Sequence, residues 1–142
     1  MFFSKIAIPT SITSIDDATF SGCSNLSQFS IPTSVISINN NVFSGCSILS
    51  EIEIPQSVTV IRENVFSNCS SLVKITIPAT ITSIGKSAFK CCSQLKSFEI
   101  PTSIAVIEEN TFYGCKQLDH IFFPSNIQII ENNAFTGCSS LR

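Results

Sequence analysis

The feature that most constrains this 142-residue chain is an internal period of 23 residues. Its six prolines are spaced at that interval, and a phenylalanine, a cysteine and a leucine recur in step with them. In the second repeat these positions hold Pro32, Phe43, Cys46 and Leu49. A period of about 20 to 50 residues is typical of solenoids, because one unit is too small to bury its own core and must stack on its neighbours. We therefore expect a single solenoid domain of six repeats over residues 1–142.

Each repeat is predicted to contain two short strands. Before each proline, apolar and polar residues alternate, as in residues 29–31, which predicts a strand with one buried face. Proline ends that strand because it has no N–H to donate to a neighbour. Six such strands at constant spacing predict a parallel ladder. Beyond the proline, Val35 and Ile38 with their Ser, Thr and Ile flanks predict a second short strand.

The rest of the repeat, for example residues 41–46, has apolar residues at helical spacing. It predicts a single helical turn that ends on a residue with left-handed backbone conformation. Glycine holds that final position in four repeats, whereas Asn68 and Cys91 hold it in the third and fourth. Because cysteine tolerates positive φ less well than asparagine, we expect local strain at Cys91.

Phenylalanine and cysteine are predicted to stack inside the coil, each ring burying roughly 150–250 Å². Six of the seven cysteines share one inward position, and stacked side chains point in parallel, which disfavours disulfide geometry. We expect reduced packing residues, as in a reducing compartment. Cys91 follows a different pattern, since Cys92 occupies the inward position. It is either a reactive or intermolecular thiol or an inert replacement for glycine.

The repeat pattern Leu-x-x-Ile-x-Ile-Pro-x-Ser-Val/Ile-x-x-Ile-x-x-x-x-Phe-x-x-Cys-x-x-Leu resembles the BspA-like, or Treponema-type, leucine-rich repeat. Residues 81–85 and 88–92 come closest to the family form. The resemblance implies a β-rich, right-handed, curved coil with a parallel sheet on its concave face. It also implies a family rich in surface proteins of oral bacteria and parasitic protists, often associated with adhesion.

Composition excludes several classes of partner. The net charge is −2 and only 13% of residues are charged, without a basic stripe, so we expect no nucleic acid. No apolar run approaches the roughly 18 residues of a membrane span. The opening residues 1–5 have no signal-peptide anatomy, which favours a cytoplasmic location. The alternative, implied by the resemblance, is the cell surface.

Catalytic and metal-binding patterns are also missing. His120 is the only histidine, and its neighbour Asp119 is expected to face the opposite side of a strand, which argues against a catalytic pair. A zinc site would need a Cys-x₂-Cys pair or a paired histidine, and a phosphate site a glycine-rich loop. We expect no enzyme activity, no cofactor and no metal.

Binding residues are sought on the outward face of the first strands, because solenoids present a long curved surface there. Glu51 beside Lys74 would form a favourable cross-strand pair. Phe122 is an aromatic residue in an otherwise small or polar row, and we interpret it as a contact point or, alternatively, as cover for the chain end. The predicted protein-binding residues are Gln28, Glu51, Glu53, Lys74, Glu99, His120 and Phe122.

Two functions follow as hypotheses. The first is a scaffold or adaptor that binds a protein partner through the concave sheet. The alternative is a surface adhesin that binds host extracellular matrix protein, as the resemblance implies. Neither end of the solenoid carries a recognisable cap, so we expect a two-fold homodimer built end to end. The alternative is that further repeats of a longer array cover the ends.

Overall fold

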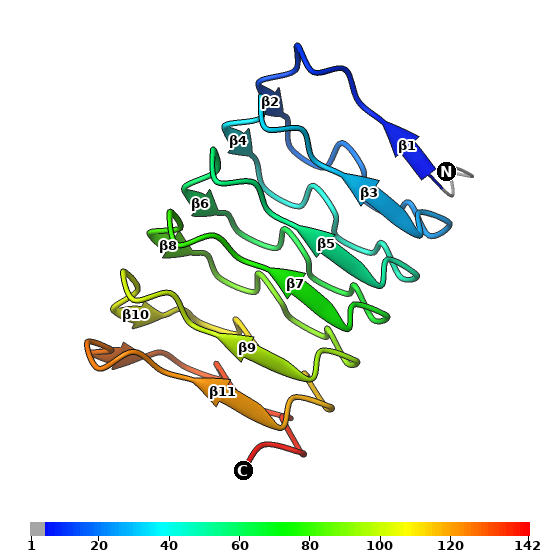
Figure 1. Cartoon of the computed structure of the whole chain (residues 1–142). Helices are drawn as coiled ribbons and strands as arrows, with labels where there is room; N and C mark the ends of the chain where they lie inside the picture. Colours follow the sequence, from blue (N-terminus) through cyan, green and yellow to red (C-terminus); the bar gives the residue numbers. More distant parts are fainter. Residues whose placement is uncertain (1–4) are drawn as a thin grey trace.

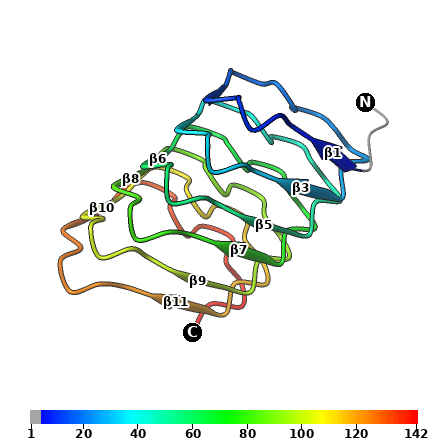
Figure 2. The ribbon, with the colours of Figure 1, turned by 45° about the horizontal axis from the view of Figure 1, so that its top comes forward.

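The computed structural model describes residues 5–142, which form six coils of 23 residues stacked along one axis (Figure 1). Coil 1 spans residues 5–27 and coil 6 spans residues 120–142. The residues before Lys5, on which the expectation about a signal peptide partly rests, lie outside the described range. Coils 1 and 6 lie at opposite ends of the stack, and the tilted view in Figure 2 shows the coils following one another. The predicted repeat solenoid is confirmed.

Each coil contributes two short strands, as predicted. The first strands are β1 (Lys5–Ala7), β3 (Gln28–Ser30), β5 (Glu51–Glu53), β7 (Lys74–Thr76), β9 (Ser97–Glu99) and β11 (His120–Phe122). The second strands are β2 (Ser14–Ile15), β4 (Ser37–Ile38), β6 (Val60–Ile61), β8 (Ser83–Ile84), β10 (Val106–Ile107) and β12 (Ile129–Ile130). All paired strands are parallel, and each residue pairs with the residue one period away, such as Phe29 with Ile6.

The strand ladder is less continuous than predicted. The first strands are hydrogen-bonded in three pairs, β1 with β3, β5 with β7 and β9 with β11. β3 and β5 are neighbours, but no strand ladder joins them within residues 5–142. Side chains bridge such junctions. The Ser57 hydroxyl donates to the Val35 carbonyl at 2.5 Å, and the Ser103 hydroxyl donates to the Ile81 carbonyl.

The predicted helical turn is wrong, since the described residues contain strands and turns but no helix. In residues 41–45 alternate N–H groups donate to the next coil instead of back along their own turn. Asn41 donates to the Glu63 carbonyl at 3.0 Å, and Phe43 donates to the Val65 carbonyl at 2.9 Å. The same three donor positions recur at all five junctions between coils. We call this continuous set of bonds the turn ladder.

Positive φ angles explain why the segment cannot be helical. Two positions in each coil have left-handed backbone, represented by Asn41 (φ 60°) and Gly45 (φ 77°). A left-handed residue interrupts a right-handed helix. The N–H groups of Asn41 and Gly45 themselves donate to the neighbouring coil. Cys91 has a φ of 59°, close to the 61° of Asn68, so the left-handed backbone predicted for this position is confirmed, while the local strain expected at Cys91 stays a prediction. The sequence prediction missed the first of the two positions, which asparagine holds in four coils.

The core consists of columns of identical side chains. Phe43, Phe66, Phe89 and Phe112 are fully buried, and successive rings stack at 5.5 to 5.6 Å. Beside them, each inward cysteine from coil 2 onward donates its S–H to the phenylalanine carbonyl of the preceding coil, as Cys69 does to Phe43 at 3.1 Å. The cysteines therefore supply a hydrogen bond as well as packing volume, and no disulfide joins them.

Candidate protein-binding surface

The candidate site is the outward face of the first strands, which we call the strand face. Its side chains are exposed on both sides of a buried central residue, as Gln28 and Ser30 flank Phe29. The period-two alternation produces this arrangement, because one set of side chains fills the coil and the other points to solvent. The strands thus place all seven predicted binding residues on one exposed face.

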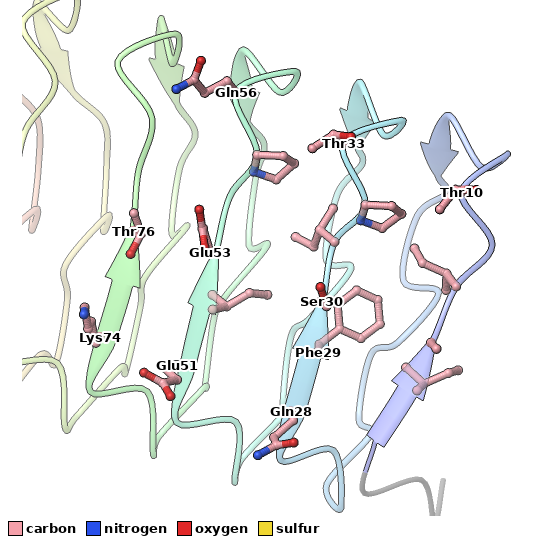
Figure 3. A pocket seen from close by; sticks show the side chains of 17 residues that line it. Thr10, Gln28, Phe29, Ser30, Thr33, Glu51, Glu53, Gln56, Lys74 and Thr76 are labelled. Atoms are coloured by element: carbon pink, nitrogen blue, oxygen red, sulfur yellow. The ribbon is translucent and has the colours of Figure 1, made fainter.

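The strand face is hollowed in two places. A hollow of about 1090 Å³ extends over β1, β3, β5 and β7, and Gln28, Glu51, Glu53 and Lys74 line it. Figure 3 shows Gln28, Glu51 and Lys74 following one another across neighbouring strands. A second hollow of about 500 Å³ lies over β7 and β9, with Glu99 and Phe122 in its wall. Six of the seven predicted residues line the two hollows, and His120 lines neither of them.

Acidic groups predominate on this face. Glu51, Glu53 and Glu99 are exposed, whereas Lys74 is the one lysine or arginine among the outward residues of β3, β5, β7, β9 and β11. Glu51 and Lys74 face each other in register, as predicted, but they form no ion pair within 4.0 Å in the part of the chain that the structure describes. Exposed pairs gain little from contact in water, so the carboxylates stay available to a partner.

Asp119 and His120 do contact each other, contrary to the sequence prediction. The Asp119 carboxylate lies 2.7 Å from Nδ1 of His120. Asp119 precedes β11 and does not follow the alternation of the strand, so its side chain can turn toward the histidine. The hydrogen bond from His120 lowers the pKa of the Asp119 carboxyl. The His120 ring also stacks on Phe122 with centroids 6.4 Å apart, so the three side chains form a polar and aromatic cluster at one end of the strand face.

Phe122 is 58% exposed and pairs with Glu99 on the neighbouring strand. Its ring lies on the outward side of β11, where it helps to form the second hollow. A large exposed aromatic side chain beside a carboxylate is an arrangement that favours a protein contact.

Cys91 lies on the turn ladder, away from the strand face. Its N–H donates to the Tyr113 carbonyl at 2.7 Å, and its side chain is half-buried. The sulfur faces the next coil, because a Cβ placed on Gly114 would lie 3.3 Å from it. A reactive role for Cys91 therefore remains a prediction. In the core, burial and, secondarily, the thiol of Cys23 raise the pKa of Cys46 to about 12.

Among residues 5–142 no group of three or more His, Cys, Asp or Glu side chains is arranged to hold a metal ion. No described helix has the length and apolar character needed to cross a bilayer.

These features define a leucine-rich repeat solenoid with a hollowed strand face. The chain belongs to the BspA-type leucine-rich repeat family, whose profile matches it in six copies over residues 2–118 and 38–142. Leucine-rich repeat proteins are generally scaffolds for protein interaction, and their extended curved surfaces serve that purpose. A search of curated protein sequences gave no match.

Solved structures of bacterial proteins share the fold. A leucine-rich repeat protein from Bacteroides ovatus is 32% identical with a TM-score of 0.86, over 97% of this chain and 36% of that one. The T. pallidum leucine-rich repeat protein is 26% identical with a TM-score of 0.78, over 97% of this chain and 78% of that one. A leucine-rich cell surface protein from Faecalibacterium prausnitzii is 27% identical with a TM-score of 0.56, over 94% of this chain and 51% of that one. The chain thus spans about a third of the Bacteroides ovatus protein.

Proposed function

We propose that residues 1–142 act as one solenoid domain that binds a protein partner through the strand face. The observation that carries this proposal is the hollow of about 1090 Å³ over four neighbouring strands, lined by polar side chains without partners of their own on that face. Family membership supports it, since repeats of this class generally serve protein interaction.

The chemistry of the strand face defines the kind of partner. On β3 to β11, three exposed carboxylates against one lysine favour a basic partner surface, because opposite charges guide association and suppress wrong partners. Phe122, stacked on His120, supplies an apolar anchor beside Glu99. The partner therefore presents Lys or Arg side chains together with an apolar recess for the ring.

The test uses affinity purification from cells. It compares a charge reversal and an aromatic-to-alanine substitution on the strand face with the same two kinds of substitution on the turn side of the coil. Glu53→Lys and Phe122→Ala act on the strand face. Their matched controls, Glu63→Lys and Tyr113→Ala, act on exposed side chains of the turn side of the coil. The proposal expects a protein that the parent and both controls retain and that both strand-face variants lose by at least about tenfold. Equal recovery by all five proteins would contradict the assignment of the strand face.

A cell-surface adhesin is the second candidate function. It is favoured by the similarity to the Faecalibacterium prausnitzii protein, which is described as a cell surface protein. The two candidates differ in location and in the redox state of the thiols. Labelling by a membrane-impermeant reagent on intact cells, with binding to extracellular matrix protein, would support the adhesin. Seven reduced thiols in protein isolated from cells, with no external labelling, would support the internal scaffold.

We also propose that the chain associates with itself through one end of the solenoid. The support is apolar side chains that the last coil leaves exposed, among them Phe123 and Ile130. Sedimentation velocity at tens of micromolar would test it, since a strictly monomeric protein would contradict it.

A further inference from the structure

The coils are joined in pairs on their strand sides, by which we mean the part of each coil from its first strand to the residue after its second strand, residues 28–39 in coil 2. Ladders through both the first and the second strands join coil 1 to coil 2, coil 3 to coil 4 and coil 5 to coil 6. No strand ladder joins coil 2 to coil 3 or coil 4 to coil 5 within residues 5–142. In Figure 1 the pair β9 and β11 lies apart from β7. We call these two the unpaired junctions and the other three the paired junctions.

Individual hydrogen bonds of the first strands show the same alternation in coils 2 to 5. The N–H groups of Ile54 and Ile100 donate to carbonyls across paired junctions, each at 3.0 Å. Ile31 and Ile77 hold the same repeat position before the unpaired junctions, and their N–H groups have no hydrogen-bond partner in the described part of the chain. Ile31 is 7% exposed and Ile77 is partly exposed, whereas Ile54 and Ile100 are 2% exposed. The strand side is therefore more open at the unpaired junctions.

The second strands separate at the same places. At each paired junction the residue after the second strand of the later coil donates its N–H to the earlier coil at 2.8 to 3.0 Å, namely Asn39, Gly85 and Glu131. The matching residues at the unpaired junctions, Arg62 and Glu108, make no such bond to any described residue. The alternation thus affects the whole strand side of the coil, although the sequence period is 23 residues throughout.

A single side-chain hydrogen bond crosses the strand sides of each unpaired junction, and we call it a serine bridge. The Ser57 hydroxyl donates to the Val35 carbonyl at 2.5 Å, and the Ser103 hydroxyl donates to the Ile81 carbonyl. Among the described residues no other hydrogen bond or ion pair joins the strand sides of coils 2 and 3, or those of coils 4 and 5. One hydroxyl therefore replaces the two ladders that join the strand sides at a paired junction.

The turn side holds all five junctions alike. The turn ladder has three bonds at every junction, and between coils 2 and 3 these come from Asn41, Phe43 and Gly45. Beside the ladder, the rings of Phe43 and Phe66 stack across the same junction at 5.5 Å. An interface that is fixed along one side and joined by one hydroxyl along the others has the form of a hinge. We infer that the solenoid consists of three two-coil units and bends about the turn ladder at the unpaired junctions, so that the strand face opens and closes there.

Both hollows of the strand face lie over these junctions. The larger hollow crosses the boundary between β3 and β5, and the smaller one lies over β7 and β9. Closure at the first boundary brings the N–H of Ile31 to the Glu53 carbonyl, which repeats the bond that Ile54 makes to Thr76 at a paired junction. The closed form thus gains hydrogen bonds for buried N–H groups, whereas the open form keeps the hollows wide. A molecule that binds in the hollows shifts the population toward the open form.

The bending goes beyond the proposed function, since it is a property of the chain alone and needs no partner for its test. NMR of the purified chain with reductant measures it at single amides. The amides of Ile31 and Ile77 should exchange with solvent at least about tenfold faster than those of Ile54 and Ile100, because local opening precedes exchange. Relaxation dispersion should show motion on the microsecond to millisecond scale at Ile31 and Ile77 only.

The order along the chain is an internal control. Fraying from one end would give a gradient of exchange from coil to coil, whereas the hinge gives fast, slow, fast and slow exchange at Ile31, Ile54, Ile77 and Ile100. Equal exchange rates, a gradient, or flat dispersion profiles at Ile31 and Ile77 would each overturn the inference.

A pair of variants tests the serine bridge. Ser57→Ala removes the hydroxyl at an unpaired junction. Ser34→Ala is the matched control, because Ser34 makes the equivalent bond to the Ile12 carbonyl at 2.6 Å across a paired junction. Loss of one hydrogen bond should raise amide exchange at Ile31 by roughly threefold or more in Ser57→Ala and leave Ile54 unchanged, while Ser34→Ala changes neither. Circular dichroism verifies that both variants are folded. An equal response of Ile31 to the two substitutions would contradict a hinge held by one hydroxyl, and the alternation in the parent chain tests the hinge without any variant.

Discussion

Removal of one central thiol should measure what the cysteine column contributes to stability. Cys69 is fully buried, and its S–H donates to the Phe43 carbonyl at 3.1 Å. Cys69→Ala removes this donor and the volume of the sulfur. The Phe43 carbonyl keeps the bond from the N–H of Cys46 at 3.1 Å, so no acceptor is left without a partner. The full penalty for an orphaned buried carbonyl therefore does not apply.

The expected magnitude follows from three contributions. Loss of a buried group the size of a methylene costs about 0.8 kcal/mol. A residual cavity of about 30 Å³ costs a further ~0.7 kcal/mol. The lost hydrogen bond costs about 0.5 kcal/mol, at the low end of the usual range because a thiol is a weak donor. Cys69→Ala should therefore lower the free energy of unfolding by about 2 kcal/mol.

Urea denaturation followed by circular dichroism, with reductant present, measures this change. Cys138→Ala is the matched control, because Cys138 makes the same S–H bond at 3.1 Å in the last coil but is only partly buried. Its substitution should cost less than about 1 kcal/mol, since less buried surface is lost. If Cys69→Ala and Cys138→Ala destabilise equally, or if Cys69→Ala costs less than about 0.5 kcal/mol, the contribution assigned to the buried thiol column is wrong.

Three further predictions concern pH, the ring column and the turn ladder. Burial in the folded state raises the pKa of Cys46 from 9.0 to about 12, so the contribution of the protonated thiol to the free energy of unfolding is complete below pH 9. It is lost as the pH rises toward 12, by roughly 1 kcal/mol at pH 10. Urea midpoints between pH 7 and pH 10 that do not fall would contradict this. Phe66→Ala should lower the free energy of unfolding by about 3–5 kcal/mol and Phe135→Ala by less than half as much, because Phe66 stacks between two rings whereas Phe135 stacks on one and belongs to the last coil. Equal losses in urea denaturation would contradict the stabilisation assigned to stacking within the ring column. Gly114→Ala should lower the free energy of unfolding by about 1–2 kcal/mol, because φ is 74° and the new Cβ meets the Cys91 sulfur at 3.3 Å. In a double-mutant cycle Cys91→Gly should relieve part of that loss, and strictly additive effects of the two substitutions would exclude the contact.

The stacking of the coils can be predicted from the sequence, because the 23-residue period, the first strands and the buried columns all arise from the same recurring residues. Alternation places Gln28 outside and Phe29 inside, and strict spacing places identical rings in one column. The local turn could not be predicted from apolar spacing alone. Val42, Phe43 and Cys46 are spaced as in a helix, but hydrogen bonds to the next coil decide the direction of their N–H groups.

A signal for the correct turn was nevertheless present. Asparagine at the position of Asn41 recurs in four coils, and asparagine is enriched in left-handed backbone. The Asp119–His120 contact was missed for a related reason. The alternation of a strand was applied to a residue that lies one position before the strand begins, where the backbone is no longer pleated. The role of the thiols as donors depends on a carbonyl 26 residues away, so it is visible only once the coils are stacked.

The distribution of stabilising contacts explains why the strand face can serve binding. The turn ladder, the serine bridges and the core columns all hold the coils together on other sides of the molecule. The described outward side chains of β3, β5 and β7 contribute no ion pair to this framework. Substitutions such as Glu53→Lys therefore change the charge of the face while leaving the contacts between coils in place. A solenoid of this kind can acquire a new partner through its outward rows without loss of its fold, because recognition and stability depend on different side chains.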